Sequence, residues 1–286
     1  MNVRNLFRGL GLSFLLYSSD LRAEYYTSSR PLSFDRDDVA VAGLEIIVSC
    51  AIAGLPQMPK LRKVLTQCGK GALAGIVIYG GEKAASHVST PGMGWVAQIL
   101  VNGGASMREN AARDKGLLEE VNYTFGPLAV RIGENPNWYV HPGFAVAVAE
   151  AFRTESSLNL EASLLSGILV FEYTDSSRKR PNSHVAANAI FINRTNVLLT
   201  DRVLRTIYSH EAIHVVQYRS FGTAEIGLRT IPSYVLFSDI THLVYGADLG
   251  QGALYMLSLP FAHENKPVEF VAERLVDKKE VFDGTE

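Results

Sequence analysis

One helical segment constrains this chain more than any other part of it. In TDRVLRTIYSHEAIHVVQYR, residues 200–219, apolar, histidine and glutamine side chains recur at spacings of three and four. Residues at these spacings share one face of an α-helix. The residues on that face are Val203, Ile207, His210, His214 and Gln217. The segment therefore predicts a strongly apolar helix that packs inside a folded domain and carries two histidines with it.

The two histidines and the glutamate between them form the pattern His-Glu-x-x-His. His210 and His214 lie one helical turn apart, so both imidazoles can point at one cation, with Zn–N distances of about 2.0–2.1 Å. Glu211 projects from an adjacent part of the helix and can reach a water molecule on the metal. Burying three such polar side chains is unfavourable without a partner. The pattern therefore predicts a zinc site with Glu211 as the catalytic general base.

A catalytic zinc usually takes a third protein ligand. The segment PVEFVAERL offers Glu269 as that ligand, and Glu273 one turn later as a hydrogen-bonding support for a ligand histidine. Two simpler interpretations stay open: Glu269 as a first-turn acid favoured by the helix dipole, and Glu273 as a solvated partner of Lys or Arg. The other downstream candidates for the third ligand are Glu225, Asp239, His242, Asp248, His263 and Glu264.

The stretch HEAIHVVQ, followed later by NKPVEFVAE, resembles the gluzincin clan of zinc metallopeptidases. It is most similar to the small bacterial members that read His-Glu-x-x-His-x-x-Gln and then Glu-x-x-Ala-Asp/Glu. The resemblance covers residues 183–276, and Glu273 stands where Asp is commoner. The zinc ligands that it implies are His210, His214 and Glu269, with Glu211 as the base and Glu273 as the support.

The same resemblance implies a strand before the active helix whose edge aligns a peptide substrate by backbone pairing. Residues 186–193, AANAIFIN, occupy the place of that strand. Many members of the clan also stabilise the oxyanion with a Tyr or His. Tyr245, Tyr255 and His263 are the candidates here, and spacing does not choose among them.

The spacing of apolar residues along the chain changes near Asn193. Before it, glycine-rich segments show the two-residue period of strands. These predicted strands are residues 71–81, 94–106, 120–133, 142–152, 158–173 and 184–193, while residues 44–54 fit either a strand or a buried helix. After Asn193 the period becomes helical, in residues 200–219, 231–246, 252–261 and 265–279. We expect an α+β fold, in which a β-rich N-terminal half packs with or precedes a helical, zincin-like C-terminal half.

The N-terminus has the layout of an export signal. Arg4 and Arg8 precede the apolar run GLGLSFLLY, and Ala23 offers a cleavage point. An uncleaved anchor and an ordinary buried helix are the alternatives. The domains that we expect are residues 1–23, an export signal or N-terminal anchor; residues 24–182, a β-rich region of unknown role; and residues 183–286, a metallopeptidase-like catalytic region.

If residues 1–23 are an export signal, the protein is periplasmic, associated with the cell envelope or secreted. In those compartments Cys50 and Cys68 could form a disulfide, and two buried thiols are the other possibility. A net charge of −2 argues against a nucleic-acid partner, which would require a basic face. We expect no cofactor beyond zinc, and the N-terminus or the β-rich region could contact a membrane.

The leading interpretation is a zinc metallopeptidase, a hydrolase in which metal-bound water attacks a peptide carbonyl and Glu211 passes its proton to the leaving amine. The alternative is a non-catalytic cell-envelope β protein, an outer-membrane barrel or a sandwich, with a degenerate or structural zinc site. A third is a zinc-bound binding module that has lost turnover, although the intact Glu211 argues against it. The peptide or protein substrate is not specified by any motif.

Overall fold

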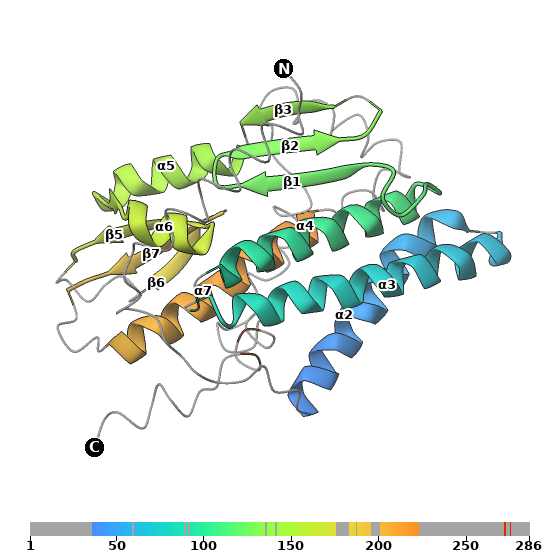
Figure 1. Cartoon of the computed structure of the whole chain (residues 1–286), viewed down its shortest axis with the longest axis horizontal. Helices are drawn as coiled ribbons and strands as arrows, with labels where there is room; N and C mark the ends of the chain where they lie inside the picture. The colour runs from blue at the N-terminus through green and yellow to red at the C-terminus, as the bar shows by residue number, and fades with distance from the viewer. Residues whose placement is uncertain are drawn as a thin grey trace.

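The computed structural model describes residues 36–222, apart from residues 59, 89, 91, 135, 141, 176–182, 187 and 196–200, together with Ala272 and Leu275. This part of the chain is a mixture of helices and two small sheets (Figure 1). The helices are α2 (Arg36–Gly54), the short 3₁₀ helix η1 (Leu55–Gln57), α3 (Leu61–Ala85), α4 (Met93–Ala112), α5 (Pro142–Thr154), α6 (Leu160–Ser166) and α7 (Asp201–Gly222). The strands are β1 (Val121–Phe125), β2 (Leu128–Ile132), β3 (Asn137–Val140), β4 (Ser157–Leu158), β5 (Leu169–Tyr173), β6 (Ser183–Ala186) and β7 (Ala189–Asn193).

Helices α2, α3 and α4 pack against one another through small residues (Figure 1). A Cβ added at Gly75 of α3 would come within 2.5 Å of the carbonyl oxygen of Glu45 on α2. One added at Gly104 of α4 would come within 2.9 Å of the carbonyl oxygen of Ala74 on α3. Because glycine has no Cβ, the backbones can approach this closely. A disulfide between Cys50 and Cys68 also joins α2 to α3, which answers the question that the two cysteines left open.

The prediction of a β-rich N-terminal half is wrong. Three α-helices and η1 precede the first described strand, and the predicted strands at 71–81, 94–106 and 142–152 are all helical. Helix α6 occupies residues 160–166 of the strand predicted at 158–173, and residues 44–54 adopt the helix of their two alternatives. The strands counted in these segments for a barrel or a sandwich are therefore helices. Five glycines of these segments lie instead at contacts between helices, where an added Cβ would collide with a neighbouring backbone: Gly71, Gly75, Gly81, Gly94 and Gly104. Pro142, read as the start of a strand, is the first residue of α5, a position that suits its fixed φ.

The strands β1, β2 and β3 form an antiparallel sheet alongside α4. Residues 120–133, predicted as a single strand, are instead two strands, β1 and β2, joined in a hairpin. Its turn uses Gly126, whose φ of +53° lies in the left-handed region that favours glycine. The polar face of β1 meets α4: the backbone N–H of Asn122 donates to Ser106 Oγ at 2.9 Å. Asn102 Nδ2 donates to the carbonyl oxygen of Thr124 at 3.3 Å.

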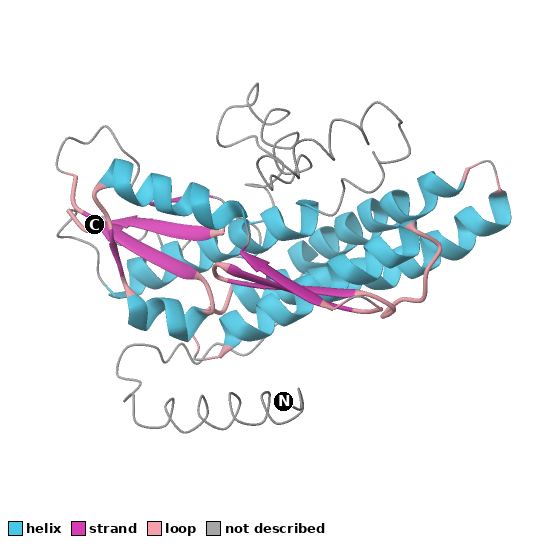
Figure 2. Cartoon of the chain, turned by 90° about the horizontal axis from the view of Figure 1, so that it is seen from above, coloured by secondary structure: helices cyan, strands magenta, loops and turns pink. Residues whose placement is uncertain are grey.

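The second sheet has the strand order β4-β5-β7-β6, with β5 parallel to β7 and β6 antiparallel to β7. Helices lie on both sides of this sheet (Figure 2). Ile190 and Ile192 of β7 join the core cluster that contains α7. Phe191 points to the opposite face, where its ring stacks on that of Phe171 with centroids 5.0 Å apart, and Ala147 of α5 belongs to the same cluster.

The strand that was expected to offer a free edge, residues 186–193, contains β7, which is paired on both sides. That part of the prediction is wrong. Among the described strands, β6 is the one at the edge of the sheet beside α7. The sequence could not separate the two because 186–193 runs from the end of one strand into the next.

Candidate metal centre

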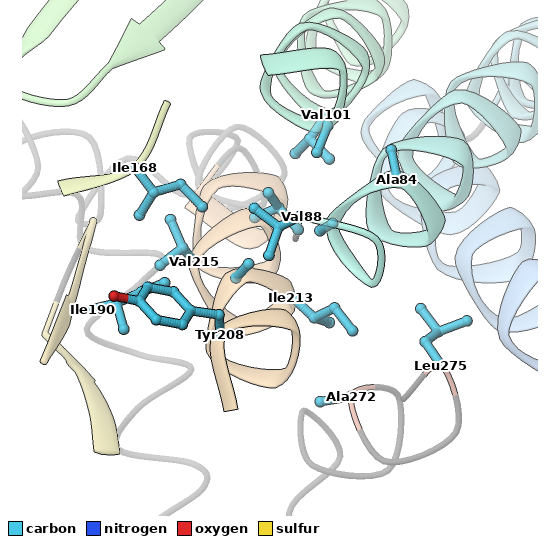
Figure 3. Close-up of a cluster of buried hydrophobic side chains, with 14 of the residues drawn as sticks. Ala84, Val88, Val101, Ile168, Ile190, Tyr208, Ile213, Val215, Ala272 and Leu275 are labelled. Carbon is cyan, nitrogen blue, oxygen red and sulfur yellow. The ribbon is translucent and has the colours of Figure 1, made fainter. Parts of the chain in front are cut away.

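Helix α7 is confirmed and lies in the middle of the core. Ala212, Ile213, Val215 and Val216 are completely buried, and Figure 3 shows Tyr208, Ile213 and Val215 reaching from α7 toward different neighbours. Ile168 and Ile190 lie on one side of α7 in that view, and Val88, Val101 and Ala84 on another. Several polar side chains of the helix are buried as well, which is unfavourable unless each has a partner: Ser209, Glu211, His214, Gln217, Arg219 and Ser220.

The two histidines of the motif converge. His210 Nε2 and His214 Nε2 lie 3.0 Å apart, and the two rings are nearly perpendicular at 88°. Two nitrogen ligands on a tetrahedral zinc, at bonds of about 2.0–2.1 Å, lie about 3.3 Å from each other. The pair is therefore within a few tenths of an ångström of the spacing that the cation requires, and these residues fit the metal.

Gln217 holds the second histidine in the tautomer that a metal needs. His214 Nδ1 lies 3.1 Å from Gln217 Oε1, and an amide oxygen only accepts, so Nδ1 carries the proton. The lone pair of His214 is then on Nε2, which faces His210. Gln217 is 1% exposed, so its position is held by packing. The helical period predicts Gln217 on the histidine face but not this role, for which its spacing of three residues from His214 is the available signal.

Glu211 is buried at 6% exposure and has a partner on the edge strand. Ser183, the first residue of β6, donates a hydrogen bond from Oγ to Glu211 Oε1 at 2.7 Å. The motif glutamate and the edge strand are thereby connected directly. This partner was also missed: it lies 28 residues away, and no local pattern marks it.

The C-terminal half of α7 is anchored to the first sheet and to α4. Arg219 Nη1 donates to the carbonyl oxygen of Thr124 at 2.8 Å, and burial lowers the pKa of Arg219 to about 9. Arg108 Nη2 of α4 donates to the carbonyl oxygen of Ser220. Because these hydrogen bonds tie α7 to β1 and to α4, the helix that carries the motif is held in place at this end.

The expected ligand Glu269 and its support Glu273 lie outside the described residues. Two neighbours of theirs are described: Ala272 and Leu275 are helical, 0% and 7% exposed, and belong to the same core cluster as α7. Figure 3 shows Ala272 and Leu275 on the side of α7 from which Ile213 projects. Outside the described residues lie also residues 1–23, predicted as an export signal or N-terminal anchor, and the remaining candidates Glu225, Asp239, His242, Tyr245, Asp248, Tyr255, His263 and Glu264.

Within the described ranges, no group of three or more His, Cys, Asp or Glu side chains is placed to hold a metal ion. The part of the centre that the structure describes is thus the pair His210 and His214, with Glu211 beside them. Comparisons of the chain with models of known protein families, with curated proteins and with solved structures found no match. Function is therefore inferred from the residues of this chain alone.

Proposed function

We propose that this protein is a zinc-dependent peptidase. The observation that carries the proposal is the pair of facing Nε2 atoms of His210 and His214, 3.0 Å apart, with Nδ1 of His214 occupied by Gln217. A pair of imidazoles so arranged, His214 buried and His210 half-buried, offers two converging lone pairs to a cation once a single proton is displaced. The ligands proposed are His210, His214 and Glu269, with Glu273 as a hydrogen-bonding support.

Zinc, when bound, polarises the substrate carbonyl and makes a water molecule more acidic. Glu211 is proposed to accept the proton of the attacking water and to deliver it to the leaving amine. Burial of Glu211 keeps competing water away from the carboxylate, and the hydrogen bond from Ser183 limits its rotation. The chain thus supplies a base that is oriented before the substrate arrives.

Strand β6 supports a peptide as the substrate class. It is antiparallel to β7, and its other side carries no strand among those the structure describes. An extended peptide could pair there by main-chain hydrogen bonds, in the way that edge strands recruit peptides elsewhere. The first residue of β6 contacts Glu211, so a peptide along this edge would pass close to the base.

The test compares zinc content and hydrolysis in three purified proteins. We expect the wild type to bind one zinc ion per chain and to cleave labelled casein or a mixture of quenched fluorescent peptides. His214→Ala should lose the metal. Glu211→Gln should keep the metal and lose hydrolysis by at least about 100-fold, because only the base is removed.

Each other outcome has a distinct meaning. Zinc bound without hydrolysis in the wild type would favour the non-catalytic binding module. Equal hydrolysis by wild type and Glu211→Gln would contradict the role of the base. A wild type that takes up no zinc would contradict the site itself. A Glu269→Ala variant with full zinc content would exclude Glu269 and leave the other downstream acids and histidines as candidates.

We also propose that the protein is exported and acts in the cell envelope or outside the cell. The disulfide Cys50–Cys68 supports this location, since disulfides persist in oxidising compartments and are rare in the cytosol. One described helix, Arg36–Gln57, is long and apolar enough to cross a membrane. The first sheet exposes Leu128, Ile132, Trp138 and Val140. Contact of the N-terminal region with a membrane is part of this proposal.

A further inference from the structure

We infer that Ser183 is a positioning residue for the base: it fixes the carboxylate of Glu211 relative to the edge strand β6. The inference rests on the proposed function and goes beyond it, since neither the motif nor the resemblance gives Ser183 a role. Its starting point is the 2.7 Å hydrogen bond from Ser183 Oγ to Glu211 Oε1.

Side chains on both faces of strand β6 contact neighbouring helices, so the strand has a fixed position relative to which Glu211 can be oriented. Successive residues of a strand point to opposite faces. Ser183 pairs with Ile192 and Val185 with Ile190, which places both on the face toward α7. His184 points to the other face.

On that second face, His184 Nε2 lies 2.9 Å from Glu150 Oε1 of α5. Its ring stacks on Phe191 with centroids 5.0 Å apart. Glu150 is held in turn by Arg153, whose Nε donates to it at 2.7 Å. The four-residue strand is therefore attached to α7 through Ser183 and to α5 through His184.

A glutamate side chain has three rotatable bonds, and the hydroxyl of Ser183 selects among its rotamers. A hydrogen bond from a neutral donor to a carboxylate is stronger than one between neutral groups, and Glu211 is buried, at 6% exposed. The base and the strand along which a peptide would pair are then positioned by one contact. A displacement of the base by about 1 Å is enough to lower turnover strongly.

The first experiment measures the contact in the metal-free protein, where activity plays no part. Denaturation midpoints are compared for wild type, Ser183→Ala, Glu211→Ala and the double variant. We expect Ser183→Ala to lower the midpoint in the wild-type background and to leave it unchanged in the Glu211→Ala background, because the partner is then gone. The same shift in both backgrounds would overturn the inference.

The second experiment measures kcat and KM of the zinc-loaded enzyme on one quenched peptide. Ser183→Ala should lower kcat by about 10- to 100-fold, the size expected for a hydrogen bond to a charged group, with KM within twofold and zinc content unchanged. Ser183→Thr, which keeps the hydroxyl and suits a strand, should restore most of the turnover. The matched control is Ser157→Ala on β4, the exposed strand at the opposite edge of the same sheet, which should behave as wild type.

The outcomes separate this inference from the proposed function. A rise in KM at constant kcat, or a Thr variant as impaired as the Ala variant, would overturn the positioning role. A wild type with no peptidase activity would overturn the proposed function and any catalytic role of Ser183. In that case a coupled midpoint shift would still support Ser183 as the residue that holds Glu211.

Discussion

Three buried polar side chains of α7 each form a hydrogen bond with a partner from a different element of the fold. His214 meets Gln217 on its own helix, Glu211 meets Ser183 on β6, and Arg219 meets the backbone of Thr124 on β1. An enclosed polar group without a partner would destabilise the fold by about 1–3 kcal/mol. These partners offset part of the cost of burying such polar side chains in an apolar core; Nε and Nη2 of Arg219 and Nε2 of Gln217 are buried without a hydrogen-bond partner among the described residues.

A residue-scale prediction concerns Gln217. Gln217→Leu removes the acceptor of the His214 Nδ1 proton, so that proton is no longer confined to Nδ1 and the imidazole loses its orientation. We expect zinc affinity to fall by about 10- to 100-fold, measured by competition with a chromophoric chelator. Gln217→Glu keeps an oxygen acceptor and should retain the affinity. Equal affinity in the Leu variant and the wild type would show that Gln217 does not orient His214.

At the scale of elements, α3 owes its packing to glycines at particular positions. Gly75 faces α2 and is buried, whereas Gly69, six residues earlier on the same helix, is exposed and has open space around it. The same amino acid thus has opposite effects on stability at the two positions. Gly75 permits close contact between two backbones, while Gly69 only weakens the helix.

An element-scale prediction follows from that contrast. Gly75→Ala should lower the free energy of unfolding by about 1–3 kcal/mol, since the new methyl group would meet the backbone of Glu45. Gly69→Ala, the matched control, should raise it by about 0.5–1 kcal/mol, because alanine favours the helix. Chemical denaturation of both variants measures the difference. A Gly75→Ala protein as stable as the wild type would mean that α2 and α3 are not packed this closely.

The spacing of apolar residues predicted the secondary structure correctly only where a segment fitted one period, helical or strand, and not both. Residues 200–219 matched the helical period alone, and α7 is confirmed. Residues 94–106 matched both: Trp95, Ile99 and Asn102 recur at helical spacing even though alternate residues are also apolar. The choice between strand and helix there depends on what the segment packs against, which is α3 on one side and β1 on the other.

At the scale of the whole molecule, a cluster of buried ionisable side chains lies among helices α2, α3 and α4 and is hydrogen-bonded to α7. Glu45 of α2, Glu82 of α3 and Arg108 of α4 are each at most 1% exposed, and Arg108 also donates to the carbonyl oxygen of Ser220. Burial raises the pKa of Glu82 well above its ordinary value, and the neighbouring Glu45 raises it further. Burial likewise raises the pKa of Glu45, which Arg108 partly opposes. Burial therefore favours the neutral form of Glu82, although the neighbouring Arg108 opposes this shift.

This cluster predicts a pH-dependent stability. The pKa of Glu82 is higher in the folded chain than its ordinary 4.5, so its contribution is complete below pH 4.5 and is lost as pH rises toward the folded pKa. Glu82→Gln mimics the neutral acid and should be more stable than the wild type at pH 8. The difference in unfolding free energy should grow with pH, by at most about 1.4 kcal/mol per unit.

Thermal denaturation of the Glu82→Gln variant and the wild type between pH 5 and pH 8 provides the measurement. Glu134→Gln, at an exposed position after β2, is the control and should differ from the wild type by a constant amount. A difference for Glu82→Gln that does not change with pH would show that Glu82 is already ionised in the fold.

The amino-acid sequence alone was enough to predict features that depend on residues close together in the chain. His210, Glu211 and His214 lie within little more than one helical turn, where the geometry of the α-helix alone sets their relative positions. The strand period of residues 120–133 was likewise a local signal, although the turn at Gly126 that divides them into β1 and β2 was not predicted. Tertiary structure decided everything that joins distant residues: the helical layer in place of strands, β6 rather than β7 as the edge, and the contact of Ser183 with Glu211. Such contacts depend on how elements pack, because periodicity describes one element and carries no information about its neighbour.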